Sequence, residues 1–190
     1  LAGAGRVVAG EQSLDAARAC GGPWGVPLGV ASAGVYKAFA RFQPTGQMMP
    51  MPVTLAVDLL ASGDFAAVAL PEPSKTAGTD GFEVRLAGKL AVGSSKLTFT
   101  VTRDGKPVKD LQPYLGAYGH HVALRIGDLA YLHVHPDEPS GGADALGGPQ
   151  IVVHAPVPTA GVYRLFLDFK VADVVHTAEF TASASRGMTM

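Results

Sequence analysis

The sequence has little of several features that mark large classes of protein. Cys20 is its only cysteine among 190 residues, which excludes an internal disulfide framework. It has no run of 18 apolar residues, so it predicts no membrane-spanning helix. Fifteen basic and sixteen acidic residues give a net charge of −1, and no block of like charge stands out. Nothing therefore indicates nucleic acid or an anionic membrane surface as a partner.

Amphipathic helical patterns are also few, whereas β-forming residues recur in short runs between turn signals. We expect strands at about residues 26–30, 35–42, 53–60, 81–87, 96–102, 150–155, 162–169 and 174–182, with a hairpin inside 113–136. This spacing predicts an all-β protein, an immunoglobulin-like or cupredoxin-like antiparallel sandwich. Gly161-Val162-Tyr163 is typical of the tyrosine-corner strand of such folds.

The first 22 residues are rich in alanine and glycine and contain no catalytic motif. Ser13 is a candidate N-cap for a short helix from Leu14 to Ala19. The chain begins with Leu1 and has no charged segment followed by an apolar one, so we expect a processed chain of a secreted or cell-envelope protein. The Ala-Arg-Ala before Cys20 is a poor lipoprotein cleavage site, and we do not expect Cys20 to carry lipid.

An internal repeat divides the chain. AGVYKAFARF at residues 33–42 matches AGVYRLFLDF at residues 160–169, with the glycine, valine, tyrosine and both phenylalanines in register. The expected parts are an N-terminal segment (1–22), a half sandwich (23–60), a linker (61–78), a complete sandwich with the histidine cluster (79–184) and a tail (185–190). The half sandwich has open strand edges that need cover, either from the second domain or from a second chain. We therefore expect a homo-oligomer, with a swapped dimer as one form of it.

Four of the six histidines lie within residues 113–136, where two β-forming runs flank Gly127-Asp128. A two-residue Gly-Asp loop predicts a β-hairpin with Val122 opposite His133 and His120 opposite His135. Side chains that oppose each other share a face of the sheet, about 4.5–5.5 Å apart at Cβ. His120, His133 and His135 should therefore gather at the open end of the hairpin, whereas His121 faces the other way.

His176 is the fourth candidate ligand. In VVHTAEFT, strand alternation puts His176 on the same face as Ala178 and Phe180, which we expect to face the core beside the hairpin histidines. Buried imidazoles need partners, and a metal cation is the strongest of them. The alternative is a structural cluster in which the imidazoles hydrogen-bond one another or backbone carbonyls. His154, in IVVHAPV, is more typical of a satisfied or exposed strand residue than of a ligand.

A family resemblance points the same way. The stretch DLQPYLGAYGHHVALRIGDLAYLHVHP, with AGVYRLFLDF and VVHTAEFTA, resembles a family of secreted or membrane-attached bacterial proteins, common in actinobacteria. That family is labelled heavy-metal-binding or YtkA-like and is cupredoxin-like in fold. Its pattern is a Gly-His that opens one strand, a His-x-His-Pro that closes the next, and a Val-His-Thr-Ala in the last strand. The resemblance implies that His120, His133, His135 and His176 bind metal, and it covers residues 79–183 and, in half, 24–60.

Imidazole ligands suit copper(II), zinc and nickel, and copper(II) binds most tightly. We therefore expect copper(II), with zinc as the second choice, bound for sequestration or delivery. A blue-copper centre would need a cysteine thiolate beside the histidines, and Cys20 lies in the unmatched N-terminal segment. Met48, Met49 and Met51 are a weaker candidate site for copper(I), because thioethers are soft ligands but also serve as apolar filler.

Two other functions stay open on the sequence alone. Three histidines around an open position also describe a catalytic zinc site, for which Asp137 and Glu138 are the only close carboxylates. No nucleophile or phosphate-loop motif accompanies them, so we do not expect an enzyme. The remaining alternative is a structural or protein-interaction sandwich module of the cell envelope, with an envelope protein as its partner and histidines that bind no metal.

Overall fold

The structure, a computed structural model, describes residues 17–18, 24–25, 29–30, 32–42, 53–114, 116–136 and 145–186, without the side chains of residues 17, 18, 24, 25, 41, 42, 133 and 135. The chain divides into two compact units, Leu1–Leu70 and Pro71–Met190. Among the residues described, no helix is long and apolar enough to cross a membrane.

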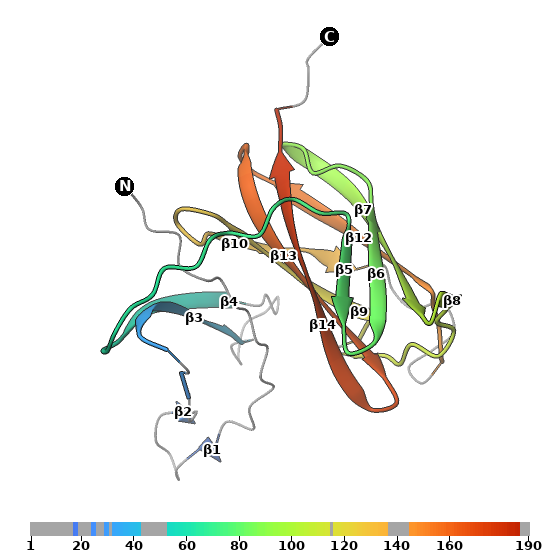
Figure 1. The fold of residues 1–190 in the computed structure, drawn as a ribbon, viewed down its shortest axis with the longest axis horizontal. Helices are drawn as coiled ribbons and strands as arrows, with labels where there is room; N and C mark the ends of the chain where they lie inside the picture. Colours follow the sequence, from blue (N-terminus) through green and yellow to red (C-terminus); the bar gives the residue numbers. More distant parts are fainter. Residues whose placement is uncertain are drawn as a thin grey trace, which may run out of the picture. The chain divides into compact units, whose positions relative to one another are not determined.

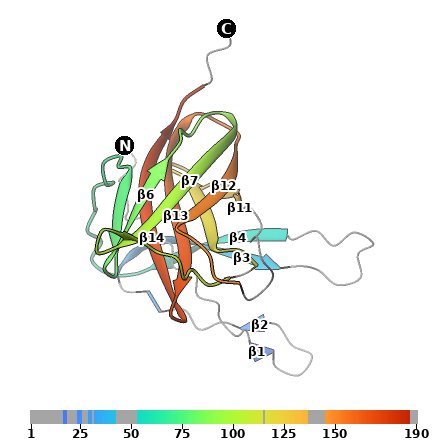
Figure 2. The ribbon, with the colours of Figure 1, turned by 90° about the vertical axis from the view of Figure 1, so that its right-hand side faces the viewer.

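The second unit is a sandwich of two antiparallel sheets (Figure 1, Figure 2). Its strands are β5 (Thr76–Thr79), β6 (Phe82–Ala87), β7 (Gly93–Arg103), β8 (Lys106–Pro107), β9 (Gly119–Arg125), β10 (Tyr131–His133), β11 (His135–Pro136), β12 (Gln150–Val157), β13 (Gly161–Val171) and β14 (Val174–Ala184). One sheet has the order β10-β9-β13-β14 and the other β11-β12-β7-β6-β5, with β8 paired to β7. The expected all-β antiparallel sandwich is confirmed.

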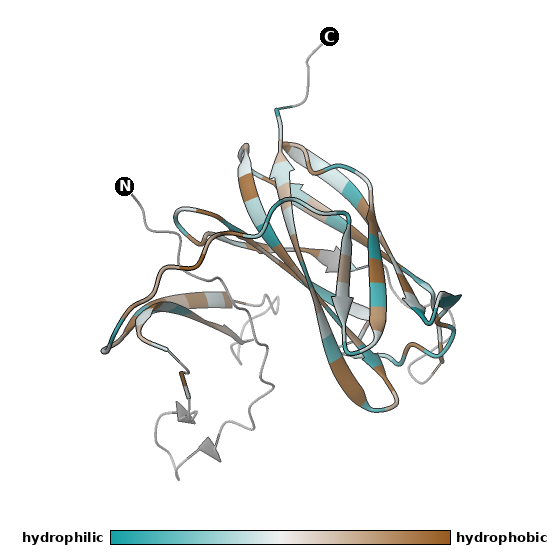
Figure 3. Cartoon of the chain, in the orientation of Figure 1, coloured by the Kyte–Doolittle hydropathy of each residue, from teal (hydrophilic) through white to brown (hydrophobic). Residues whose placement is uncertain are grey.

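The core lies between the two sheets and follows from strand alternation. Along β6 every second residue is buried, and Figure 3 shows apolar and polar positions alternating there. The largest fully buried side chains come from both sheets, among them Phe99, Leu97, Leu165, Leu167 and Phe180. Burying one such side chain stabilises the fold by roughly 1.5–3 kcal/mol. The core therefore holds the two sheets together without any disulfide.

Two Asp-Gly turns close neighbouring strand pairs of the larger sheet. Asp104-Gly105, expected from the sequence, joins β7 to β8, and Asp80-Gly81 joins β5 to β6. All four residues have positive φ, as the tight turns of hairpins require. The expectation that residues 61–78 are a linker throughout was wrong at its end, because β5 pairs with β6. The Asp-Gly turn was the signal for this short strand, whose TAGT sequence is otherwise a weak strand former.

The first unit contains β1 (Ala17–Arg18), β2 (Trp24–Gly25), β3 (Gly34–Phe42) and β4 (Val53–Ala61). β1 pairs with β2, so the helix expected from Leu14 to Ala19 is wrong where the chain is described. A six-residue helix is too short to be stable on its own propensity. Of the strand expected at 26–30, residues 26–28 lie outside the described part and residues 29–30 belong to no strand.

The β3–β4 hairpin reproduces the β13–β14 hairpin, as the repeat predicts. Tyr36 donates its hydroxyl hydrogen to the carbonyl of Ser32 at 2.7 Å, and Tyr163 donates to the carbonyl of Thr159 at 2.9 Å. Both tyrosines therefore bond the residue four positions earlier, and the expected tyrosine corner is present twice. The glycine between, Gly34 in one copy and Gly161 in the other, has the same φ of 152°.

Candidate metal site

The hairpin between β9 and β10 has the predicted register. Leu124 is paired with Tyr131 and Val122 with His133. The loop is wider than two residues, however, because the amide of Arg125 bonds the carbonyl of Ala130 at 3.1 Å. A two-residue loop would place Ile126 opposite Leu129, but Ile126 instead donates its amide to the carbonyl of Val162 on β13 at 2.8 Å.

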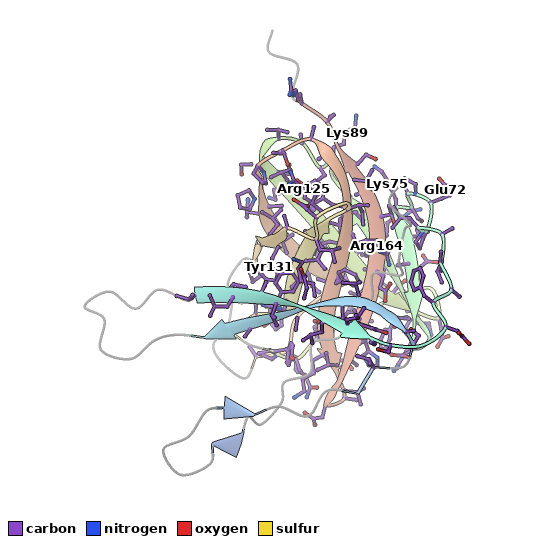
Figure 4. All side chains as sticks on the ribbon, turned by 90° about the vertical axis from the view of Figure 1, so that its left-hand side faces the viewer. Glu72, Lys75, Lys89, Arg125, Tyr131 and Arg164 are labelled. Atoms are coloured by element: carbon purple, nitrogen blue, oxygen red, sulfur yellow. The ribbon has the colours of Figure 1, made fainter. Side chains whose placement is uncertain are left out.

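The side chain of Asp128 explains this wider loop. Its carboxylate accepts a hydrogen bond from Arg125 Nε at 3.0 Å and another from the amide of Ala130 at 3.2 Å. The Arg125 side chain and the Ala130 amide hold the pKa of Asp128 at about 2, below its usual value of 3.8. Figure 4 labels Arg125 at this end of the sandwich. An ionised Asp128 therefore fixes the turn from which the two histidine-bearing strands run.

The chain changes sheet directly after His133. β10 ends at His133, and β11 begins at His135 as the edge strand of the other sheet. Between them Val134 is fully buried in the core. The expected pairing of His120 with His135 is therefore wrong, because burial of Val134 carries the strand across the edge of the sandwich. His135 is paired instead with His154 on β12.

His154 was not expected to be a ligand, yet the fold brings it to the His-x-His-Pro segment. On β12 the odd-numbered residues from Ile151 to Val157 are buried, so the even-numbered residues, His154 among them, face outward. His154 is an exposed position. The sequence of β12 shows this alternation. It does not show that His135 is the partner of His154, because β11 reaches β12 only after the chain has changed sheet.

His120 lies on the outer face of the smaller sheet, away from the core. On the neighbouring strand β13 its register partner is Asp168, whose carboxylate accepts a hydrogen bond from the hydroxyl of Thr177 at 2.5 Å. The side chain of His120 is 7% exposed. Gly119 before it leaves room for the other sheet, since a Cβ there would stand 2.8 Å from the side chain of Ile151. The Gly-His pair thus combines a close sheet contact with an outward imidazole.

His176 lies on the opposite face from His120. On β13, Phe169 is paired with both His176 and Gly119, one position away from the Asp168–His120 pair, and neighbouring positions of a strand face opposite ways. The expectation that His176 joins the hairpin histidines on one side is therefore wrong. His176 packs between Phe82 and Phe169, with ring centroids 4.7 Å and 5.5 Å away.

The partner of His176 is a carboxylate. Its Nδ1 atom is 2.8 Å from an oxygen of Asp80, in the turn between β5 and β6. Asp80 also lines an open hollow on that hairpin, together with residues 76–79, 81–83 and Asp104. The imidazole thus links the turn at the edge of the larger sheet to β14 of the smaller sheet, and this contact stabilises the sandwich.

His121 points into the core and His120 points away from it. The sequence predicted the reverse, with His120 on the core side beside His176 and His121 on the opposite side, and that prediction was wrong. It is 0% exposed and its ring stacks near Phe99, with centroids 5.3 Å apart. Neither ring nitrogen has a hydrogen-bond partner within the described structure. Burial, and to a smaller degree the neighbouring charge on His120, lowers the pKa of His121 from 6.5 to about 3. His121 is therefore a neutral core residue.

Among the side chains that the structure describes, which exclude those of His133 and His135, no three His, Cys, Asp or Glu residues stand close enough to hold one metal ion. Several expected residues also lie outside the described part: Cys20, Met48, Met49, Met51, Asp137 and Glu138. The fold thus separates the four histidines expected to cluster. It leaves His133 and His135 on successive strands at one edge, His120 on the outer face, and His176 bound to Asp80.

The chain was also compared with known proteins. A family model described as a domain of unknown function, DUF8832, matches residues 75–186, which is more than half of the chain. The chain belongs to this family. The match spans all the strands of the sandwich and its histidines, and it leaves the β3–β4 hairpin outside. Comparisons with curated proteins and with solved structures found no match.

Proposed function

We propose that this DUF8832 protein binds a divalent transition metal, copper(II) before zinc, at the sandwich edge where the chain changes sheet. The pairing of His135 with His154 is the observation that carries the proposal. Residues opposed in an antiparallel pair have Cβ atoms about 4.5–5.5 Å apart, which suits two imidazoles that bind one ion at about 2.0–2.1 Å. His133, two residues before His135, is the nearest further ligand along the chain.

The choice of metal follows from the donors. Neutral imidazoles bind copper(II) more tightly than zinc or nickel. A pair of strand histidines leaves several coordination positions to water or to a partner molecule, which suits sequestration or hand-over of the metal rather than a closed structural site. The resemblance to heavy-metal-binding, YtkA-like proteins supports the same role and an extracytoplasmic setting.

The proposal differs from the ligand set expected from the sequence. His176 is left out because it lies on the core side, opposite to His120, and its ring is packed between two phenylalanines. His120 lies on β9, the strand that pairs with β10, and faces away from the core. It therefore remains a candidate for a further metal ligand from the outer face.

Elemental analysis tests the site directly. Untagged protein is loaded with copper(II) or zinc, desalted and analysed, beside the variants His135→Ala, His154→Ala and His176→Gln. We expect about one metal per chain in the parent and in His176→Gln, and loss of metal from the other two variants. Retention by His154→Ala together with loss from His176→Gln would contradict the edge site.

The alternative is a protein-interaction module of the cell envelope whose histidines are structural. It is favoured by His121 and His176, which occupy packed positions suited to stability. On this reading neither copper(II) nor zinc stays with the parent protein, and His176→Gln lowers stability while His154→Ala, at an exposed position, does not. The same set of variants therefore separates the two functions.

A further inference from the structure

The duplicated hairpin gives each residue of β3 and β4 a counterpart in the sandwich. Gly34 is paired with Ala61 on β4, and Gly161 is paired with Ala184 on β14. Aligning the hairpins on these pairs makes β3 equivalent to β13 and β4 equivalent to β14. The hydrogen bonds of the two tyrosine corners, from Tyr36 and from Tyr163, fall at equivalent positions in this alignment.

The outer faces of the two hairpins correspond in their chemistry. Lys37 on β3 forms an ion pair with Asp58 on β4 at 2.9 Å. At the equivalent positions Arg164 donates to the hydroxyl of Thr181 at 2.9 Å. Figure 4 labels Arg164 on β13. The face of β3–β4 that carries Lys37 therefore corresponds to the outer face of the sandwich, and its opposite face corresponds to the core-facing side.

We call this opposite side of the hairpin the inner face; it consists of Tyr36, Ala38, Ala40, Leu55, Val57 and Leu59. In the sandwich the counterparts of Leu55 and Val57 are Ala178 and Phe180, which are 0% and 1% exposed under the other sheet. Leu55 and Val57 themselves are each 57% exposed. The inner face is thus a core-type surface without its second sheet, and a two-stranded hairpin is marginally stable alone.

We propose that the inner face is covered by the inner face of a second copy of this chain, packed face to face about a two-fold axis. The proposal is independent of metal binding. It requires no exchange of strands between the two sandwiches, because it uses only β3 and β4. Two sheets stacked in this way form a small core between them, as the two sheets of the sandwich do.

The side chains of the inner face are complementary to themselves. Across the ladder Ala38 is paired with Val57 and Ala40 with Leu55, so along these two pairs β3 presents small residues and β4 large ones, whereas Tyr36 and Leu59 at one end are both large. A two-fold axis that runs parallel to the strands, between the two faces, places β4 of one copy over β3 of the other. Val57 then packs over the partner's Ala38 and Leu55 over the partner's Ala40, so that at these two pairs large residues fill the space left by small ones.

Charge does not oppose the pairing of like chains. The inner face contains no charged residue, and Lys37 and Asp58 neutralise each other on the opposite face. The whole chain has a net charge of −1, so two copies repel each other weakly. An uncharged, self-complementary patch is what a two-fold, isologous interface needs.

The size of the face sets the expected strength. Nine residues per strand make a face about 30 Å long and two strands wide, which is smaller than the roughly 800 Å² per partner of a standard interface. We therefore expect a reversible dimer whose population rises with protein concentration.

Sedimentation equilibrium of the full chain over a wide range of concentrations tests the proposal. Val57→Lys places a charge at the centre of the inner face. Leu60→Lys is the matched control, because Leu60 is an apolar residue on the same strand, 78% exposed, that faces the other way. We expect a monomer–dimer equilibrium in the parent and in Leu60→Lys, and a dissociation constant raised on the order of a hundredfold in Val57→Lys.

Each other outcome overturns the proposal. A parent that stays monomeric at every concentration would mean that no second copy covers the inner face. A parent that dimerises equally well after either substitution, or that loses its dimer after both, associates through another surface. Thermal unfolding of the sandwich should be the same in all three proteins, which excludes misfolding as the cause of any loss.

Discussion

His176 and Asp80 join the two sheets of the sandwich at one edge. The Nδ1 atom of the imidazole, on β14, lies 2.8 Å from the carboxylate of the turn between β5 and β6. His176 is 7% exposed, so its ring depends on this acceptor more than a surface histidine would. β5 is only four residues long and pairs with β6 alone, and the contact holds it beside β14.

Asp80→Gly should destabilise the sandwich. Glycine adopts the positive φ of this turn without strain, so the substitution removes the hydrogen bond and costs some backbone entropy. Asp104→Gly is the matched control, since Asp104 also precedes a glycine in a hairpin turn, with a φ of 51° against 48° for Asp80. Urea unfolding should place Asp80→Gly about 1 kcal/mol below Asp104→Gly, because a buried imidazole loses its acceptor. Equal free energies of unfolding in the two variants would show that the hydrogen bond between His176 and Asp80 does not stabilise the sandwich.

Acid should weaken the fold through His121. Its pKa is about 3 in the folded protein, below the 6.5 of the unfolded chain, because burial penalises the charged ring. The unfolded state therefore binds more protons between these values. Above pH 6.5 both states are neutral at this residue and its effect is absent; below pH 6.5 the free energy of unfolding falls progressively towards pH 3.

His121→Leu isolates this effect. The variant has no titrating group at this position and no unpaired ring nitrogen in the core. Urea unfolding at pH 7 and pH 5 should give a smaller loss of stability on acidification in His121→Leu than in the parent, by on the order of 1–2 kcal/mol. Parallel losses in the two proteins would mean that other groups carry the acid sensitivity.

Sequence patterns predicted most strands and the register of the histidine hairpin, because alternation and turn residues are local signals. The pairing of Val122 with His133 followed from them. The change of sheet at Val134 did not, since an apolar residue between two polar ones gives the same sequence pattern whether the strand continues or crosses to the other sheet. The sequence offered one sign of this change: the β-forming run from Tyr131 is short and ends at Pro136, a residue that is confined to edge strands and bulges within sheets.

The face of His176 illustrates a second limit. Alternation correctly placed it on the core side with Ala178 and Phe180. Whether that side is shared with His120 depends on the registers of β9 with β13 and of β13 with β14, and these are long-range pairings that no local pattern encodes. The family resemblance predicted that four histidines bind one metal, whereas the strand pairings place them on different faces and sheets.

Copper(II) binding should depend on His135 and His154 as a unit. If both imidazoles hold one ion, His135→Ala and His154→Ala each remove the chelate, and the double variant should lose little more than either single one. We expect each single variant to weaken copper(II) binding by about 10- to 100-fold in a competition titration, with His176→Gln as the control. Additive losses would indicate two separate weak sites on the two strands.

The tyrosine corner should stabilise each unit separately. Tyr163 is 1% exposed and donates its hydroxyl to the carbonyl of Thr159 inside the sandwich, so Tyr163→Phe leaves that acceptor without its donor. We expect a loss of about 1 kcal/mol in the free energy of unfolding of the sandwich. Tyr36→Phe is the matched control, because the same bond to Ser32 lies in the first unit. Near-ultraviolet circular dichroism during urea unfolding should detect a shift of the sandwich transition in Tyr163→Phe alone. A comparable shift in Tyr36→Phe would mean that the two units unfold as one.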